Sequence, residues 1–328
     1  MKTNISPVVE SHNSPLKAIS FLIAGVFVFS LQDAIIKWIS GNYPVHEIVF
    51  IRSVFAVIPI LLIAQLEGGF QLLRTRHYGL HIIRAFLMFV AYMSFYLSLA
   101  ALPLAETVSL FFSAPLFITI LSVTLLREKV KIGGWIAVLV GFFGVIVMLK
   151  PGAKMINPAG LLAILSAFVY ATGSILTRRL GKTESGVALA FYPTIMYILF
   201  STIVGIVLSP GVVAQKSHPS LAFLFREWQL PSQGDLFLLI LIGLIAAMGF
   251  YFLSQAYRLA QPSTIASFEY TAVPLSVVLG YIFWKDIPGP QSIIGIMLIV
   301  GSGLYIFGSK KLLANRYVLS IFKIKIRK

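Results

Sequence analysis

The sequence contains no cysteine, so disulfide bridges, thiol catalysis and thiolate metal sites are excluded. Its five histidines form no His-Glu-x-x-His pattern and join no carboxylate cluster with metal-ligand spacing, so we expect no metal site. The chain also lacks a phosphate-binding glycine loop of the ATPase type and a Gly-x-Ser-x-Gly turn. We therefore expect neither an ATP-driven pump nor a soluble enzyme, and no cofactor.

Charged residues are scarce as well: they make up 11% of the chain, whereas 58% of the residues are hydrophobic and the mean hydropathy is +0.93. A helix needs about 20 apolar residues to cross a hydrocarbon core of about 30 Å. Ten segments meet this requirement, and their continuous apolar runs favour helices over a transmembrane barrel. The predicted spans are residues 16–38, 45–66, 79–100, 104–126, 132–149, 159–180, 186–208, 235–256, 262–283 and 290–308.

The basic residues are unevenly distributed over the connecting segments. With the N-terminus in the cytoplasm, roughly three times as many Lys and Arg residues fall inside as outside. We therefore predict a multi-pass protein of a bacterial-type inner (plasma) membrane, with both termini cytoplasmic. The first apolar run is too long for a signal peptide and no cleavage site follows it, so residues 1–15 are expected to be a flexible tail before a retained helix.

The formal net charge of +15 does not indicate nucleic-acid binding, because the cations are spread over short loops and a tail. Residues 309–328 mix Lys and Arg with Ile, Leu, Phe and Tyr. This composition suits contact with anionic lipids of the inner leaflet, and a solvated tail that fixes topology fits it equally.

A proline pattern occurs twice along the chain. Pro103 and Pro115 are twelve residues apart, and Pro262 and Pro274 repeat that spacing 159 residues later. The stretch FVFSLQDAIIKW in the first span parallels FVYATGSILTRR in the sixth. Each half contains five spans, and an odd number starts the second half on the opposite side of the membrane. We predict two inverted five-helix repeats, residues 16–150 and 159–308.

Four stretches carry a resemblance to a known family: FFSAPLF, LLREKV, GWIAVLVGFFGVIVMLKPG and FEYTAVPLSVVLGYIFWKD. Together with the five-plus-five arrangement, the chain resembles EamA-type members of the drug/metabolite transporter superfamily over about residues 16–308. The resemblance implies alternating access and a central cavity built mainly from helices 1, 3, 4, 6, 8 and 9. Members of this superfamily carry amino acids, riboflavin, S-adenosylmethionine or other metabolites.

Four ionisable residues lie within predicted spans, where each costs about 2.5–3.5 kcal/mol unless it faces the bundle interior. Helix geometry places Asp33 and Arg52 on the outer side of the midplane and Arg84 and Glu269 on the inner side. Glu269 is expected to neutralise Arg84, to bind a polar substrate group or to carry a proton. Fixed ion pairs that lock helix packing remain the alternative for both pairs. Glu47 and Glu106 are predicted as solvated helix ends.

Aromatic and polar side chains surround these positions and are predicted to line the cavity, with packing in the membrane core as the alternative. The candidates are Phe111, Phe112, Tyr170, Tyr251 and Gln255. Pro115 and Pro274 lie deep in their spans, where a missing N–H kinks a helix. Such kinks either expose backbone groups to a substrate or serve packing alone.

We predict a secondary transporter that moves a small organic metabolite by alternating access. Riboflavin, S-adenosylmethionine and amino acids are the candidate substrates, and the aromatic lining favours a planar one. Proton coupling, exchange and facilitated diffusion remain open as driving modes. The alternatives are a non-transporting receptor or scaffold on a transporter fold and, more remotely, an intramembrane enzyme acting on lipid.

Overall fold

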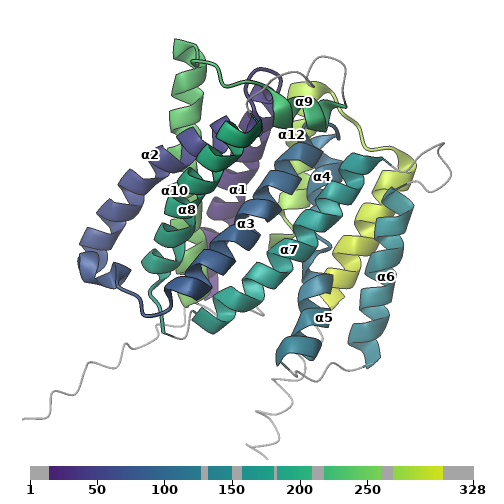
Figure 1. Cartoon of the computed structure of the whole chain (residues 1–328). Helices are drawn as coiled ribbons and strands as arrows, with labels where there is room; N and C mark the ends of the chain where they lie inside the picture. Colours follow the sequence, from purple (N-terminus) through teal and green to yellow (C-terminus); the bar gives the residue numbers. More distant parts are fainter. Residues whose placement is uncertain are drawn as a thin grey trace, which may run out of the picture.

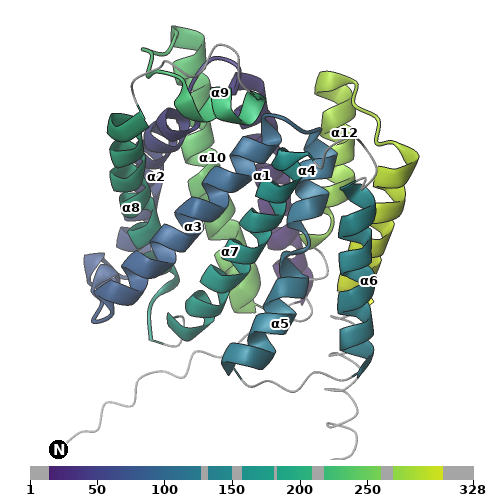
Figure 2. The ribbon, with the colours of Figure 1, turned by 45° about the vertical axis from the view of Figure 1, so that its right-hand side comes forward.

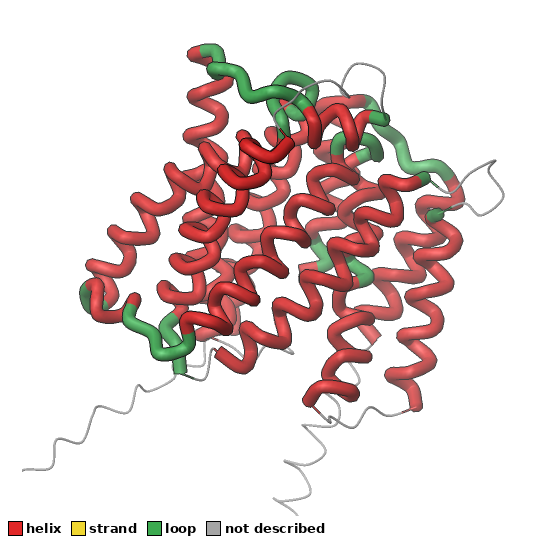
Figure 3. Tube along the Cα trace, in the orientation of Figure 1, coloured by secondary structure: helices red, strands yellow, loops and turns green. Residues whose placement is uncertain are grey.

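The computed structural model describes residues 15–126, 132–149, 157–180, 183–208, 218–259 and 269–305. Every regular element in these ranges is helical (Figure 3). The elements are α1 (Pro15–Ile39), α2 (Val45–Glu67), the short 3-10 helix η1 (Phe70–Leu73), α3 (Tyr78–Leu99), α4 (Leu104–Phe111), α5 (Ala114–Leu126), α6 (Ile132–Met148), α7 (Pro158–Leu180), α8 (Gly186–Leu208), α9 (Pro219–Phe225), α10 (Gln233–Leu259), α12 (Ala272–Trp284) and a final helix, Pro290–Tyr305.

The helices have the lengths and composition of membrane spans. Seven apolar segments are long enough to cross a bilayer, with α4 and α5 counted together as Leu104–Leu125. The three shorter apolar helices are α6, α12 and the final helix. The protein is therefore an all-helical membrane protein, as the hydropathy pattern predicts. Residues 260–268, the first part of the predicted ninth span, and the basic tail 309–328 lie outside the described residues.

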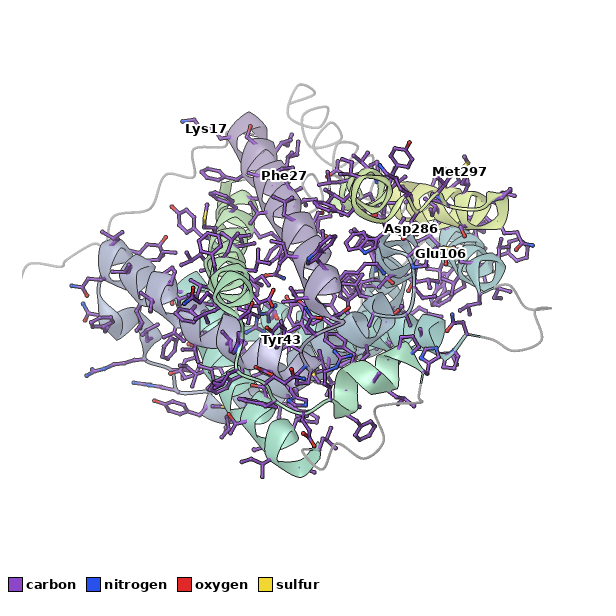
Figure 4. The ribbon with its side chains drawn as sticks, turned by 90° about the horizontal axis from the view of Figure 1, so that it is seen from above. Lys17, Phe27, Tyr43, Glu106, Asp286 and Met297 are labelled. Carbon is purple, nitrogen blue, oxygen red and sulfur yellow. The ribbon has the colours of Figure 1, made fainter. Side chains whose placement is uncertain are left out.

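Apolar side chains cover the outside of the bundle, as a lipid-facing surface requires. Leu66 and Met297 are 86% and 67% exposed, whereas Arg52 and Glu47 are only 3% and 2% exposed. Figure 4 looks along the bundle and shows Met297 at its edge and Tyr43 near its middle. The surface of the bundle is thus apolar, whereas that of a soluble domain is polar, and polar groups of this protein lie inside the bundle.

The helices pack in pairs that join the two halves, and α3 and α7, for example, lie side by side in Figures 1 and 2. The first span, α1, packs on the eighth, α10, and the equivalent sixth span, α7, packs on the third, α3. The second span packs on the seventh (α2 with α8) and the fourth on the ninth (α4 with α12). Each contact of one half therefore has its counterpart in the other, which is the pattern of a pseudo-twofold axis.

Equivalent loops lie at opposite ends of the bundle. One end, the α9 end, holds α9 and the loop of residues 40–44, because Arg226 donates to the Ser40 and Tyr43 carbonyls. The other end, the η1 end, joins residues 68–77 to residues 183–185, because Thr75 donates to Glu184. The loop after the first span and the loop after the sixth thus face opposite sides, so the two halves are inverted.

Two spans are broken at equivalent points. The fourth span ends as α4 at Phe111, turns at residues 112–113 and resumes as α5 just before Pro115. In the ninth span, residues 270–271 form a turn before α12, and Pro274 follows. Proline cannot donate the helical hydrogen bond, so the carbonyl four residues earlier loses its usual partner. The two breaks place irregular backbone inside the bundle.

Candidate functional site

A buried cluster joins the first three spans. The Arg52 Nη1 atom of α2 donates to the Tyr96 hydroxyl of α3 at 2.8 Å, and Gln32 Nε2 of α1 donates to the same oxygen at 3.1 Å. Gln32 is 1% exposed and Tyr96 is fully buried. Gly243 on α10 lies against the Arg52 backbone, where a larger residue would clash, so α10 approaches α2 closely at this level.

Two tyrosine rings hold the Arg52 guanidinium. Its central carbon lies 5.3 Å from the ring centre of Tyr92 and 5.7 Å from that of Tyr96. Tyr92 also contacts the Tyr197 ring edge-on at 5.8 Å. A cation over an aromatic face is stabilised by the ring quadrupole, and more so when it is shielded from water. Arg52 is therefore fixed without a carboxylate in direct contact.

Asp33 belongs to the same cluster but is held apart from Arg52. The charge of the half-buried Asp33 interacts with Arg52, Tyr92 and Tyr96. The two described charges make no direct ion pair, since the ion pairs among the described residues are those of Glu184 with two histidines. Asp33 and Arg52 therefore interact electrostatically, without a direct ion pair.

Arg84 on α3 is anchored by hydrogen bonds to α7 and α8. Its Nε donates to Thr177 Oγ1 of α7 at 2.6 Å, and its Nη1 donates to the Leu189 carbonyl of α8 at 2.8 Å. Leu189 stands four residues before Pro193, which has no N–H to offer that carbonyl. Arg84 thus satisfies a carbonyl that a proline frees.

Glu269 lies in the ninth span directly before its break. Its charge interacts with Tyr170 of α7 and with the adjacent Tyr270. The charge of Arg84 also reaches Tyr170. Tyr170 therefore interacts electrostatically with both of the ionisable groups that helix geometry placed on the same side of the midplane.

Aromatic rings connect the Arg52 cluster to both helix breaks. The Phe111 ring lies 5.2 Å from Phe95 and 5.1 Å from Tyr170. At the breaks themselves, the Phe112 and Tyr270 rings lie 5.1 Å apart. The predicted candidates Phe111, Phe112 and Tyr170 thus form one continuous aromatic row through the bundle.

The remaining predicted cavity residues lie on α10. Tyr251 is half-buried, and its ring centre lies 6.2 Å from that of its neighbour Phe252. The backbone of Gln255 belongs to α10, but its side chain lies outside the described residues.

Lys37 closes the interior at the α9 end. Its Nζ donates to the Leu99 carbonyl at 2.9 Å and to the Leu102 carbonyl at 2.5 Å, and it lies 5.5 Å from the Trp284 ring centre. These contacts join α1 to the α3–α4 connection and to α12. The carbonyls at the end of α3 have no helical partners of their own, so a cation there is favourable.

Glu47 was expected at a solvated helix end, and this expectation is wrong. Glu47 is buried under the segment that follows α9, and its Oε2 accepts from the Gln229 N–H at 3.1 Å. Beside it, Trp228 Nε1 donates to His46 Nδ1 at 2.5 Å. Arg226, whose pKa burial lowers from its ordinary value, donates to the 40–44 loop. No sequence pattern predicted that this segment covers the α9 end.

Glu106 is half-buried, and its Oε1 accepts a hydrogen bond of 2.5 Å from Ser292 of the final helix. It is therefore engaged in a contact between spans.

At the η1 end, Glu184 contacts three groups, two from the α2–α3 connection and one from the first turn of α3. Thr75 Oγ1 donates to Oε1 at 2.7 Å, His77 Nδ1 lies 3.1 Å from the same oxygen, and His81 Nε2 lies 3.6 Å from Oε2. Burial alone would raise the pKa of the Glu184 carboxyl, but hydrogen bonds from Thr75 and His77 and the charge of His81 outweigh it and lower the pKa. This loop contact holds the α2–α3 connection to the α7–α8 connection.

Sequence reasoning missed four residues of the interior cluster: Gln32, Tyr92, Tyr96 and Tyr197. A signal existed for two of them. Arg84, Met88, Tyr92 and Tyr96 recur every four residues and therefore lie along one face of α3. An arginine and two tyrosines on one face of an apolar helix indicate a polar interior.

Comparison with known proteins identifies two matching segments. Residues 16–150 and residues 157–308 each match the EamA-like transporter family. A solved crystal structure of 17% sequence identity superimposes with a TM-score of 0.63, over 92% of this chain and 98% of the other, and shares the fold.

Three relatives align along almost their whole length. The S-adenosylmethionine uptake transporter of Rickettsia conorii is 28% identical over 92% of this chain and 96% of its own length. The riboflavin transporter of Vibrio cholerae is 26% identical over 89% and 93%, respectively. The pseudopaline exporter of Pseudomonas aeruginosa is 25% identical over 87% and 94%. These proteins share a fold while their names give different substrates.

Proposed function

Because the chain belongs to the EamA-like transporter family, we propose that it carries its substrate by alternating access through one central site. It is a membrane transporter of small metabolites with two EamA domains, not an enzyme.

The contact between Phe112 and Tyr270 carries this proposal. It joins the breaks of two equivalent spans, one from each inverted half. Transporters with inverted repeats bind substrate where discontinuous helices meet near the midplane, because the halves can exchange conformations around that point. The aromatic row and the cluster of Arg52 and Asp33 then supply the wall and the polar groups of the site.

The contacts of Lys37 close the α9 end of the bundle, which supports alternating access. Lys37 ties α1 to the α3–α4 connection and to α12, and these contacts involve both halves of the chain. Opening this end requires Lys37 to leave the Leu99 and Leu102 carbonyls. In our proposal, Lys37 is the closing contact of one of the two alternating states.

We further propose that the α9 end faces outward across a bacterial-type plasma membrane, with both termini in the cytoplasm. Arg74 and Arg76 at the η1 end support this orientation. The first repeat is then residues 16–150 and the second residues 159–308, and the basic tail 309–328 meets the anionic inner leaflet.

Solute counterflow in proteoliposomes tests this function. Purified protein is reconstituted with a high internal concentration of S-adenosylmethionine or riboflavin, the substrates named for relatives, and uptake of the labelled compound is followed. Labelled amino acids form a third arm. Transient accumulation of one compound supports carriage. Thermal stabilisation by a compound without flux would instead indicate a receptor on a transporter fold.

A further inference from the structure

The Arg52 cluster contains buried polar atoms without partners. Within the described part of the chain, the Arg52 Nε donor and the Gln32 Oε1 acceptor make no hydrogen bond, although both are buried. A buried donor or acceptor left unpaired costs about 1–3 kcal/mol. The two side chains share Tyr96 as a partner, so the unpaired atoms belong to one site.

The unpaired donor stands on a particular edge of the guanidinium. Nη1 is engaged by Tyr96, whereas Nε belongs to the edge with which arginine binds a carboxylate through two parallel hydrogen bonds. The rings of Tyr92 and Tyr96 hold the guanidinium plane. Arg52 is thus oriented for an anion that the described residues do not supply in direct contact.

Asp33 places a carboxyl group in the same cluster. It interacts with Arg52 electrostatically but makes no direct ion pair with it. A guanidinium and a carboxyl group that stand apart inside an apolar bundle suit a ligand that carries both signs, because the ligand then pairs with each of them.

We propose that this cluster binds a zwitterionic head group of the transported metabolite, with a carboxylate on Arg52 and an ammonium between Asp33 and Gln32 Oε1. The inference rests on the function proposed above and narrows its substrate class. The aromatic row beginning at Phe95 and Phe111 offers a stacking surface for a planar ring attached to the head group. A substrate that joins an amino-acid head group to a planar ring satisfies both parts, whereas riboflavin has the ring without the head group.

The test uses compounds that share the adenosyl group and differ in the head group or at the sulfur. Counterflow of labelled S-adenosylmethionine is measured against three unlabelled competitors: S-adenosylhomocysteine, which keeps the zwitterion but lacks the sulfonium; decarboxylated S-adenosylmethionine, which lacks the carboxylate; and methylthioadenosine, which lacks the head group. We expect S-adenosylhomocysteine to compete about ten- to a hundredfold better than the other two, since a hydrogen-bonded charge contributes about 1.5–3 kcal/mol. Labelled amino acids and riboflavin are tested in parallel as substrates.

Variants separate binding from packing. Arg52→Gln is expected to abolish the preference for zwitterions, Arg52→Lys to retain part of it, and Asp33→Asn to weaken binding of compounds with an ammonium group. Lys285→Gln removes a cation at the α9 end outside the cluster and serves as the matched control. Unfolding temperatures of all variants report on folding.

The outcomes are distinguishable. A preference for zwitterions that depends on Arg52 supports the inference, whether the compound carried is S-adenosylmethionine or an amino acid. An unchanged preference in Arg52→Gln with a lowered unfolding temperature overturns it and makes Arg52 a packing residue. Flux of riboflavin that is indifferent to Arg52 overturns it while leaving the transport function intact. Absence of flux and of ligand-dependent stabilisation for every compound removes the proposed function, and the inference with it.

Discussion

The Phe112 and Tyr270 rings lie 5.1 Å apart, each at the break of its span. The two residues come from opposite halves of the chain, in the fourth and ninth spans, which pack against each other across the pseudo-twofold axis. The contact brings the two irregular backbone segments together inside the bundle.

Restoring the helix at a break is expected to slow transport without loss of stability. Pro115→Ala returns an N–H to α5 and allows the helical hydrogen bond that proline removes. We expect a counterflow rate several-fold lower and an unfolding temperature equal to or above that of the wild type. Pro59→Ala, in the unbroken helix α2, is the matched control. A wild-type rate in Pro115→Ala would show that the break does not serve transport.

Removing the Lys37 amine is expected to open the α9 end. The absence of cysteine allows a single Thr107→Cys reporter on α4, where the wild-type side chain is fully buried. We expect Lys37→Ala to speed labelling of this cysteine by a membrane-impermeant maleimide several-fold, because the bonds to Leu99 and Leu102 are lost.

Two further results of the labelling experiment test whether Lys37 is the closing contact. Substrate that favours closure at the α9 end should slow the labelling of the reporter again. Equal labelling rates with and without Lys37 would exclude it as the closing contact.

Glu269→Gln is expected to abolish proton coupling while leaving substrate transport intact. The glutamine keeps the size of the side chain but cannot bind or release a proton, so counterflow is retained while uptake driven by a proton gradient is lost. Both assays use the same liposomes, with and without an imposed pH difference. Wild-type behaviour in both assays would reduce Glu269 to a packing role.

The Glu184 contact at the η1 end is expected to stabilise the protein at neutral pH but not in acid. The pKa of Glu184 is lowered by folding, so its contribution is present above the ordinary glutamate pKa of about 4.3 and is lost as the pH falls through the folded value. Glu184→Gln should cost about 1.5–3 kcal/mol at pH 7.

Thermal unfolding in detergent across this pH range measures the effect. The difference between Glu184→Gln and the wild type should vanish in acid, and the exposed Glu227→Gln should show no difference at any pH. A difference that persists in acid would place the stabilisation elsewhere in the loop contact.

The segment that follows α9 is expected to stabilise the protein through the indole of Trp228. Trp228→Phe keeps an aromatic ring but loses the N–H that donates to His46, so the free energy of unfolding should fall by about 1–3 kcal/mol. Trp38→Phe, at an exposed tryptophan, is the control. Equal losses in both variants would mean that the His46 hydrogen bond is not responsible.

The fold could be predicted from the sequence because its determinants are local. Apolar length defines the spans, and the prolines at 115 and 274 mark the segments that the structure shows broken. The inverted arrangement follows from an odd number of spans per half. None of these features depends on which side chains meet across the bundle.

The partners of the interior charges could not be predicted in the same way. Helix depth placed Arg84 beside Glu269, yet its hydrogen bonds go to Thr177 and to the Leu189 carbonyl that Pro193 frees. Depth along the membrane is one coordinate, whereas the hydrogen-bond partner of a side chain also depends on the rotation of its helix. Every residue has a backbone carbonyl, so the sequence does not mark which carbonyl accepts the hydrogen bond. Glu47 shows the same limit, because the segment that buries it lies about 180 residues further along the chain.

Solute counterflow is the decisive measurement for alternating access, because it requires one site that is exposed alternately to the two sides. Liposomes containing the wild-type protein are loaded with unlabelled S-adenosylmethionine, riboflavin or amino acids, and the labelled compound is added outside. Alternating access predicts a transient accumulation of label above its equilibrium level for at least one compound. Equilibration without overshoot for every compound that crosses would contradict alternating access and indicate a pore.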